Sequence, residues 1–318
     1  MNNQVTTTTN QGIVQKPNFG LYMQSTNVRR SIDRALQDPK KRDRYIAAIT
    51  SAVVNTPALQ KCDFSSIVTA SLVGEALNLS PSPQLGQYYM VPFKSKAKFD
   101  KQGNMIEPES TKAQFVLGYK GYIQLAIRSG QYKKLNVMAI KRGELIRFDP
   151  MTEDIEINLI VDDTERENTE TTGYYAMFEY TNGFRKAMYW SKEKMLRHAD
   201  KYSRAFSAQV YKNLQEGKIP EKDMWKYSSF WYKDFDGMAF KTMLRQLISK
   251  WGVMSTEMQM AYSNDGAVIA RDGTPVFDDP EPTVPQYTPR QADPMAESAA
   301  PKRRNIDAEF REVSLNDI

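Results

Sequence analysis

The sequence predicts an α+β fold, in which a small antiparallel β-sheet with hairpins is flanked by N-terminal and C-terminal helices. Apolar residues recur at helical spacing in the outer parts of the body of the chain, and short runs rich in aromatic and β-branched residues lie between them. Asn182-Gly183 separates two of these runs and is the strongest short signal for a hairpin. Because helices precede and follow the strands, without βαβ alternation, a parallel sheet is not expected.

Three helices are expected before the first strand. Two lie within residues 31–59 and are separated near Pro39, and the third covers residues 63–79, with Asp63 as a suitable N-cap and "SPSP" as its stop. The apolar residues of the second helix follow the spacing of one helix face: Ile46, Ile49 and Val53.

The strands are expected between residues 87 and 190. "QYYMVPF" and "AQFVLGY" flank a polar loop at residues 94–112 and predict a long-looped antiparallel pair. "KLNVMAI" and "ELIRF" predict two further strands, an acidic loop follows at residues 149–172, and residues 173–190 predict the hairpin.

Two helices are expected after the hairpin. The first covers residues 191–206 and can begin at Ser191, and the second is a long helix over residues 228–251. An aromatic row on a helix is more often core than binding platform, and we assign this row to the core: Trp231, Phe235, Met238 and Trp251.

The composition changes near both ends of the chain. Residues 1–25 are polar and show no period, and residues 263–318 hold seven of the 16 prolines. We therefore expect a disordered N-terminal arm at 1–25, one folded domain at 26–262, and a disordered acidic tail at 263–318. Within that tail, "NIDAEFREV" could form a short terminal helix that docks on a protein partner.

The charge is divided unequally along the chain. The whole chain carries +5 and residues 263–318 carry −5, which leaves +10 on residues 1–262. A basic body suggests a polyanionic partner, and nucleic acid is the commonest one. A basic surface that serves only solubility is the alternative.

Several classes of site are excluded or disfavoured. With one cysteine and one histidine, the chain cannot form an internal disulfide and lacks the usual ligands of a zinc site. It has no nucleophile elbow and no G-x-x-x-x-G-K-S/T phosphate loop, so neither a serine hydrolase nor an ATPase is expected. No secretion signal or apolar run of ~18 residues is present, which predicts a cytoplasmic protein without a membrane segment.

Basic residues form rows at helical spacing. In "GYKGYIQLAIRSGQYKK", Lys120, Gln124 and Arg128 share one face, and Lys133 and Lys134 follow the helix. The start of this helix could also offer N–H groups to a phosphate. An ordinary solvated face is the alternative for this row.

A second row consists of Lys194, Arg197, Lys201 and Arg204, and a third of Lys241 and Arg245. Like charges at this spacing repel, and a polyanion would relieve that repulsion. Lys94, Lys96 and Lys98 in the sheet loop are weaker candidates. His198 is interpreted as a packed or surface residue, whereas several tyrosines near the rows could stack on unpaired bases: Tyr88, Tyr89, Tyr119, Tyr122, Tyr132 and Tyr202.

Nucleases that depend on a metal need clustered carboxylates. The acidic residues concentrate at residues 149–170 in a segment that resembles a loop, without a carboxylate–x–Lys pattern on a strand. A solvated acidic loop is therefore preferred over a nuclease site, which is kept as the less favoured alternative.

Three motifs in order resemble the RecT family of phage single-strand annealing proteins: "FVLGYKGYIQLAIRSGQYKKL", "KYSRAF" and "FDGMAFKTMLRQLISKW". The resemblance covers about residues 30–255. It implies a recombinase that needs no ATP or other cofactor, with Mg²⁺ at most as a DNA counterion, and that performs no covalent catalysis.

The resemblance further implies partners and site residues. The partners would be single-stranded DNA and the annealed duplex, further copies of the chain in a ring or helical filament, a phage exonuclease and a host single-strand-binding protein. The protein would act in the cytoplasm of a bacterial host, at the nucleoid during recombination. The DNA-binding residues would be Lys120, Arg128, Lys133, Lys134, Lys194, Arg197, Lys201, Tyr202, Arg204, Lys241 and Arg245, with Lys94, Lys96 and Lys98 as weaker members. A passive coat on single strands is the alternative function.

Overall fold

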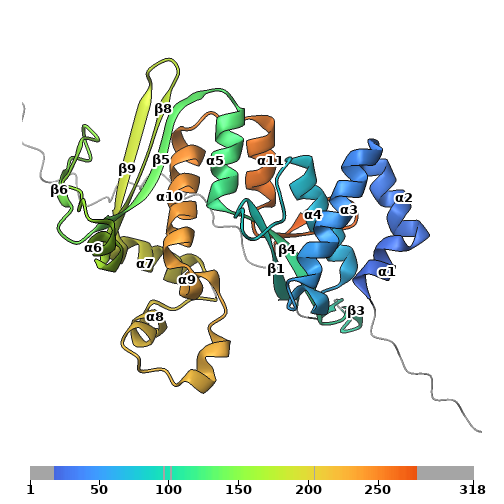
Figure 1. The fold of residues 1–318 in the computed structure, drawn as a ribbon. Helices are drawn as coiled ribbons and strands as arrows, with labels where there is room; N and C mark the ends of the chain where they lie inside the picture. The colour runs from blue at the N-terminus through green and yellow to red at the C-terminus, as the bar shows by residue number, and fades with distance from the viewer. Residues whose placement is uncertain (1–17, 96, 101, 204, 278–318) are drawn as a thin grey trace, which may run out of the picture. The chain divides into compact units, whose positions relative to one another are not determined.

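The computed structural model describes residues 18–277 apart from residues 96, 101 and 204. Figure 1 shows helices around small antiparallel sheets, which confirms the α+β class. Of the segments predicted to be disordered, 1–25 and 263–318, residues 1–17 and 278–318 lie outside the described residues.

The first sheet has four antiparallel strands in the order β1-β4-β10-β11. Its strands are β1 (Tyr88–Ser95), β4 (Ser110–Leu117), β10 (Ala267–Ile269) and β11 (Pro275–Val276). The predicted long-looped pair is confirmed as β1 and β4, and the loop between them contains the short strands β2 (Lys98–Phe99) and β3 (Met105–Glu107). The core of this part is completed by the helices α1 (Phe19–Gln24), α2 (Thr26–Ala35), α3 (Pro39–Val54), α4 (Phe64–Ala76), α5 (Tyr119–Arg128) and α11 (Thr256–Asn264).

The second sheet has the order β5-β8-β9 and contains the predicted hairpin. Its strands are β5 (Tyr132–Lys141), β8 (Thr171–Tyr180) and β9 (Arg185–Ser191). One set of its side chains packs with α7 (Lys192–Tyr202), α8 (Ala208–Gln215), α9 (Phe230–Lys233) and α10 (Phe235–Trp251). Another set packs with a separate hairpin of β6 (Leu145–Phe148) and β7 (Ile155–Ile157).

Local sequence explains where several helices begin. Asp63 accepts a hydrogen bond from the Ser65 N–H at 3.0 Å, so the predicted cap of α4 is confirmed. Pro39 stands in the first turn of α3, where its missing N–H costs nothing and its fixed φ suits the helix. The Ser191 side chain accepts from the Lys194 N–H and begins α7.

Helix α10 belongs to both large cores. Leu244 and Ile248 are buried with the first sheet, whereas Ala239, Met243 and Leu247 are buried with the second. Figure 1 shows α10 beside α5, and the rings of Tyr119 and Phe240 of these two helices are 5.5 Å apart. One helix therefore links the elements that carry the basic rows.

A buried carboxylate fixes this link. Asp265, which follows α11, accepts from Lys241 Nζ at 2.7 Å, from an Arg245 guanidinium nitrogen at 2.6 Å and from the Leu117 N–H at 2.9 Å. The Tyr122 hydroxyl lies 3.5 Å from the same carboxylate. The β4–α5 corner, α10 and the chain after α11 are thus held by one ionic network.

The predicted domain boundaries need correction on both sides. The arm was expected to reach residue 25, but Asn18 caps α1 and Phe19 and Met23 are buried. The domain was expected to end at residue 262, but Asp265 and β10 belong to the core. Composition does not reveal either α1 or β10, because a few apolar residues are enough to order a short segment that packs against a surface formed by the rest of the domain.

Three further expectations differ from the structure. The acidic segment at residues 149–172 contains β7 and a short helix, α6 (Asp163–Asn168). The long helix expected at residues 228–251 is interrupted at Asp234, whose side chain caps α10 at the Gly237 N–H. Trp251, expected in the core, is 51% exposed because it lies in the last turn of α10.

Candidate nucleic-acid interface

The glycines at the start of α5 allow close backbone packing. A Cβ atom on Gly118 would lie 2.1 Å from the Gly86 carbonyl oxygen, and one on Gly121 would lie 2.2 Å from the Gln87 carbonyl oxygen. The Gly118 N–H donates to the Gln87 oxygen at 2.9 Å. The sequence suggests that N–H groups at the start of α5 could bind a phosphate. In the structure, the Gln87 carbonyl oxygen already accepts one of these N–H groups, that of Gly118.

The cations on and after α5 are exposed, but several already have protein partners. Lys120 lies with its Nζ 6.0 Å from the centroid of the Tyr119 ring. Arg128 donates to the Leu77 carbonyl at 2.8 Å and so caps the end of α4. Lys133 and Lys134 lie 2.6 and 3.4 Å from the two carboxylate oxygens of Glu179. Exposed pairs of this kind contribute about 0–1 kcal/mol, so a phosphate can compete for these cations.

The third predicted row is a structural ion pair. Lys241 and Arg245 are mostly buried beside Asp265, and the Arg245 guanidinium also lies 4.1 Å from the centroid of the Tyr262 ring. Releasing them to a phosphate would leave the buried carboxylate unpaired, which is costly. We therefore leave both residues out of the interface.

The α7 segment presents aromatic rings and cations together. The His198 ring is 5.3 Å from the Trp190 ring and 4.6 Å from the Tyr202 ring, measured between centroids. Lys194 lies with its Nζ 4.4 Å from the centroid of Trp190, and Lys201 with its Nζ 5.2 Å from that of Tyr202. Tyr202 is 42% exposed. The segment thus offers ring faces next to positive charge.

The pKa of His198 reflects its burial first and the surrounding positive charge second. Burial, and then the nearby Lys194, Lys201, Arg245 and Lys250, lower the pKa of His198 to about 4. His198 is therefore neutral at pH 7 and packs between two rings, in line with the interpretation of it as a packed residue. The charges that act on it come from both α7 and α10.

Acidic residues do little to offset this charge. Arg197 pairs with Glu193 at 2.7 Å, and both side chains are largely exposed. The carboxylate of Asp200 accepts from the Ala208 N–H and so helps to begin α8. We name the following set the α7 surface: Trp190, Lys194, Arg197, His198, Lys201, Tyr202 and Lys250.

The remaining predicted residues fall into different places. Tyr88 and Tyr122 are fully buried in the core and cannot stack on bases, which corrects the interpretation of those two rings. Lys94 is exposed on β1, and Lys98 lies in β2. Lys96 and Arg204 lie outside the described residues.

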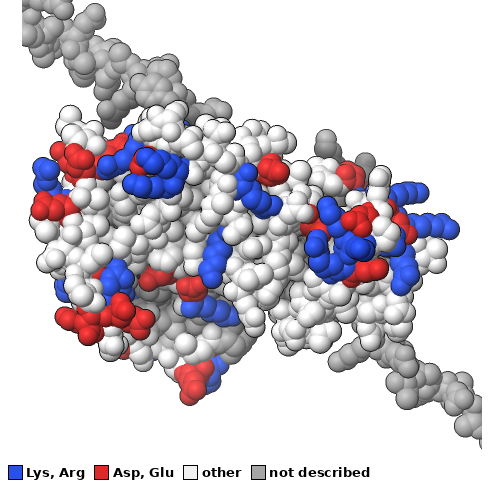
Figure 2. Space-filling view, turned by 45° about the horizontal axis from the view of Figure 1, so that its top comes forward, with Lys and Arg blue, Asp and Glu red and all other residues white. Residues whose placement is uncertain are grey.

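Basic charge is local on the visible surface. Figure 2 shows one face on which Lys and Arg occur in several separate groups, with Asp and Glu interspersed. Binding of a polyanion on such a surface depends on particular clusters rather than on a broad basic face.

Sequence reasoning missed Trp190 and Lys250 as members of the α7 surface. A signal for the first was present, because Lys194, His198 and Tyr202 are spaced by four along α7, and Trp190, near the end of β9, comes four residues before Lys194. Residues four apart are neighbours on a helix. No comparable signal marked Lys250, which acts on α7 only through the tertiary packing of α10.

Two features are absent from the described residues. These residues contain no group of three or more His, Cys, Asp or Glu side chains placed to hold a metal ion. Among the helices in residues 18–277, none combines the length and apolar character needed to cross a lipid bilayer.

Comparison with known proteins identifies the family. The chain is 38% identical over 223 residues to an uncharacterized protein of Bacillus subtilis, YqaK, a match that covers 70% of this chain and 63% of the relative. It is 27% identical over 244 residues to Protein RecT of Escherichia coli, covering 77% of this chain and 78% of the relative. The chain thus matches under two thirds of the length of the Bacillus relative. The RecT family model matches residues 43–283, well over half of the sequence, and the chain belongs to the RecT family.

Proposed function

We propose that this protein binds single-stranded DNA and anneals it to a complementary strand without ATP, as an assembly of several copies. The observation that carries the proposal is the alternation of rings and cations on the α7 surface. Cations that neutralise phosphates and aromatic faces that stack on bases are the usual means of holding single strands without reading sequence. Membership of the RecT family supports the same function.

The α7 surface suits annealing because its contacts leave base edges free. Lys194, Lys201 and Lys250 would hold phosphates, and Tyr202 would stack on a base face. Neither contact uses the groups that pair with a second strand. No bond is made or broken, so the protein acts by concentrating and aligning two strands that repel each other.

The α5 cations are proposed as a second contact. Lys120, Lys133 and Lys134 are exposed. Lys133 and Lys134 on β5 share the single carboxylate of Glu179, so one of their two positive charges is not neutralised. Arg128 can use the guanidinium N–H groups that its bond to Leu77 leaves free.

Partners follow from this function. We propose an exonuclease that produces the single strand and a host single-strand-binding protein as the protein partners. The bacterial nucleoid would be the place of action during recombination.

The experiment mixes two complementary labelled strands with the protein in the absence of ATP. Accelerated duplex formation supports annealing. Protection of the strands without acceleration would mean a passive coat, and fragments that require Mg²⁺ would mean a nuclease. Either of the latter results would overturn the proposal.

A further inference from the structure

The β6–β7 hairpin has one covered face and one uncovered face. Leu145, Ile155 and Ile157 pack against the second sheet. Around the uncovered side, apolar side chains face solvent: Ile146 is 59% exposed, Met151 91% and Val161 93%. Exposed apolar residues gathered in one short segment are typical of a contact surface. We name residues 145–168 the hairpin surface.

The charge of the hairpin surface restricts what can cover it. Asp154, Glu156, Asp163, Glu165 and Glu167 are all exposed there. None of these five carboxylates takes part in an ion pair among the residues that the structure describes. An acidic surface repels DNA, so its occupant must be a cationic protein surface.

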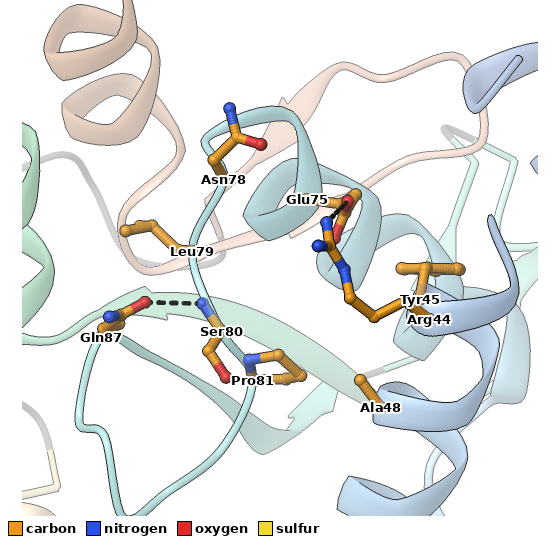
Figure 3. A pocket seen from close by; sticks show the side chains of 9 residues that line it. All are labelled: Arg44, Tyr45, Ala48, Glu75, Asn78, Leu79, Ser80, Pro81 and Gln87. Carbon is orange, nitrogen blue, oxygen red and sulfur yellow. Dashed lines mark hydrogen bonds and ion pairs between the residues drawn. The ribbon is translucent and has the colours of Figure 1, made fainter. Parts of the chain in front are cut away.

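Helix α3 carries basic residues and lines a hollow. Figure 3 shows Arg44, Tyr45 and Ala48 of α3 facing the segment after α4, with Arg44 Nη2 3.6 Å from Glu75 Oε1. The hollow has a volume of about 400 Å³, and Leu79 and Pro81 contribute apolar lining. It is large enough to accept an apolar side chain.

Several basic residues of α2 and α3 have no acidic partner among the described residues. Lys40 and Lys41 precede Arg44 by four and three residues on α3 and so share its side of the helix. With Arg29, Arg30 and Arg34 of α2, they are exposed and form no ion pair within the described part of the chain. We name α2, α3 and the hollow the α3 surface.

We propose that the hairpin surface of one copy docks on the α3 surface of the next copy. Acidic side chains would meet basic ones, and an exposed apolar residue of the hairpin would enter the hollow. The two surfaces share no residue, so the contact is heterologous and repeats into a ring or a filament. The inference rests on the proposed function in so far as annealing requires an assembly.

Two charge-reversed variants test this pairing. Asp154→Lys with Glu167→Lys places two cations on the hairpin surface, and Lys40→Glu with Lys41→Glu places two anions on the α3 surface. The new charges at positions 167, 40 and 41 suit the helix ends where they stand, which favours folding. In each variant alone, the substituted positions of one surface meet like charges on the other, whereas a 1:1 mixture restores opposite charges at these positions.

The readouts are mass by light scattering, thermal melting and binding of a labelled single strand. We expect each variant alone to lose assembly while it melts like the wild type, and the mixture to assemble again. If a double variant does not fold, the single variant on the same surface, Lys41→Glu or Glu167→Lys, is used in its place. Each single variant should still weaken assembly.

Several results would overturn the inference. The first is that the wild type stays monomeric on long single strands. The second is that either double variant assembles as well as the wild type. The third is that the mixture of the two folded variants stays monomeric. If Lys40→Glu with Lys41→Glu weakens strand binding by monomers instead, DNA occupies the α3 surface. If the wild type does not bind single strands at all, the proposed function is contradicted. The light-scattering measurement of assembly then still decides whether the hairpin surface docks on the α3 surface.

Discussion

Replacing Asp265 by alanine should destabilise the whole domain, although the residue lies in a segment that composition assigns to a tail. The side chain is 2% exposed and pairs with both Lys241 and Arg245. Removing it leaves two buried cations without a partner and the Leu117 N–H without its acceptor. Breaking a buried pair on one side costs about 3–5 kcal/mol.

That cost is large against the stability of a domain of this size. The free energy of unfolding is typically about 5–15 kcal/mol. Because 1 kcal/mol shifts Tm by roughly 2–4 °C for about 150–250 residues, Asp265→Ala should lower Tm by roughly 6–20 °C. The matched control is Glu109→Ala, which removes an exposed carboxylate and should change stability by no more than about 0.5 kcal/mol.

The pH dependence provides a second readout of the same network. Burial alone would raise the pKa of Asp265, but Lys241 and Arg245 hold it below its usual range. A carboxyl with a lowered folded pKa adds stability above its unfolded pKa of about 3.9, and this stability is lost as pH falls through the folded pKa. Urea unfolding from pH 7 to pH 3 should show a larger loss in the wild type than in Asp265→Asn, because the other carboxyls with lowered pKa, such as Glu144, contribute to both. Equal stability of Asp265→Ala and Glu109→Ala would refute the reasoning.

Three other outcomes follow from the fold. Truncation after residue 279 should keep a folded domain, whereas truncation after residue 262 should unfold it by circular dichroism, because Asp265 and β10 are lost. Gly121→Ala should lower the free energy of unfolding by roughly 1–3 kcal/mol in urea titrations, because its Cβ would overlap the Gln87 carbonyl. Since burial and neighbouring cations depress the pKa of His198 to about 4, the wild type should lose stability as pH falls from about 6.5 towards 4, and His198→Phe should lose less.

Elements set by local chemistry could be predicted from the sequence. The Asp63 cap, the Pro39 break and the hairpin at Asn182-Gly183 depend on residues within a few positions of each other. The α1 helix and β10 could not be predicted, because each is short and is stabilised by a surface formed elsewhere in the chain.

The candidate site shows the same limit. The α7 row was found because its residues recur along one helix. Lys241 and Arg245 follow the same spacing, yet they are structural, because their partner Asp265 lies 24 and 20 residues further along the chain. Three other acids have contacts elsewhere and, among the described residues, do not pair with the predicted cations: Glu144 pairs with Arg166, Asp200 caps α8 and Asp236 accepts from Tyr174.

The salt dependence of single-strand binding by Lys201→Ala tests the central claim that the α7 surface holds phosphates. Lys212 of the neighbouring α8 is also an exposed lysine, and Lys212→Ala is the control. Loss of one phosphate contact should lower the slope of log Kobs against log salt concentration by about 0.7 for Lys201→Ala and leave it unchanged for Lys212→Ala. If both variants keep the wild-type slope, the α7 surface does not contact the strand and the account is contradicted.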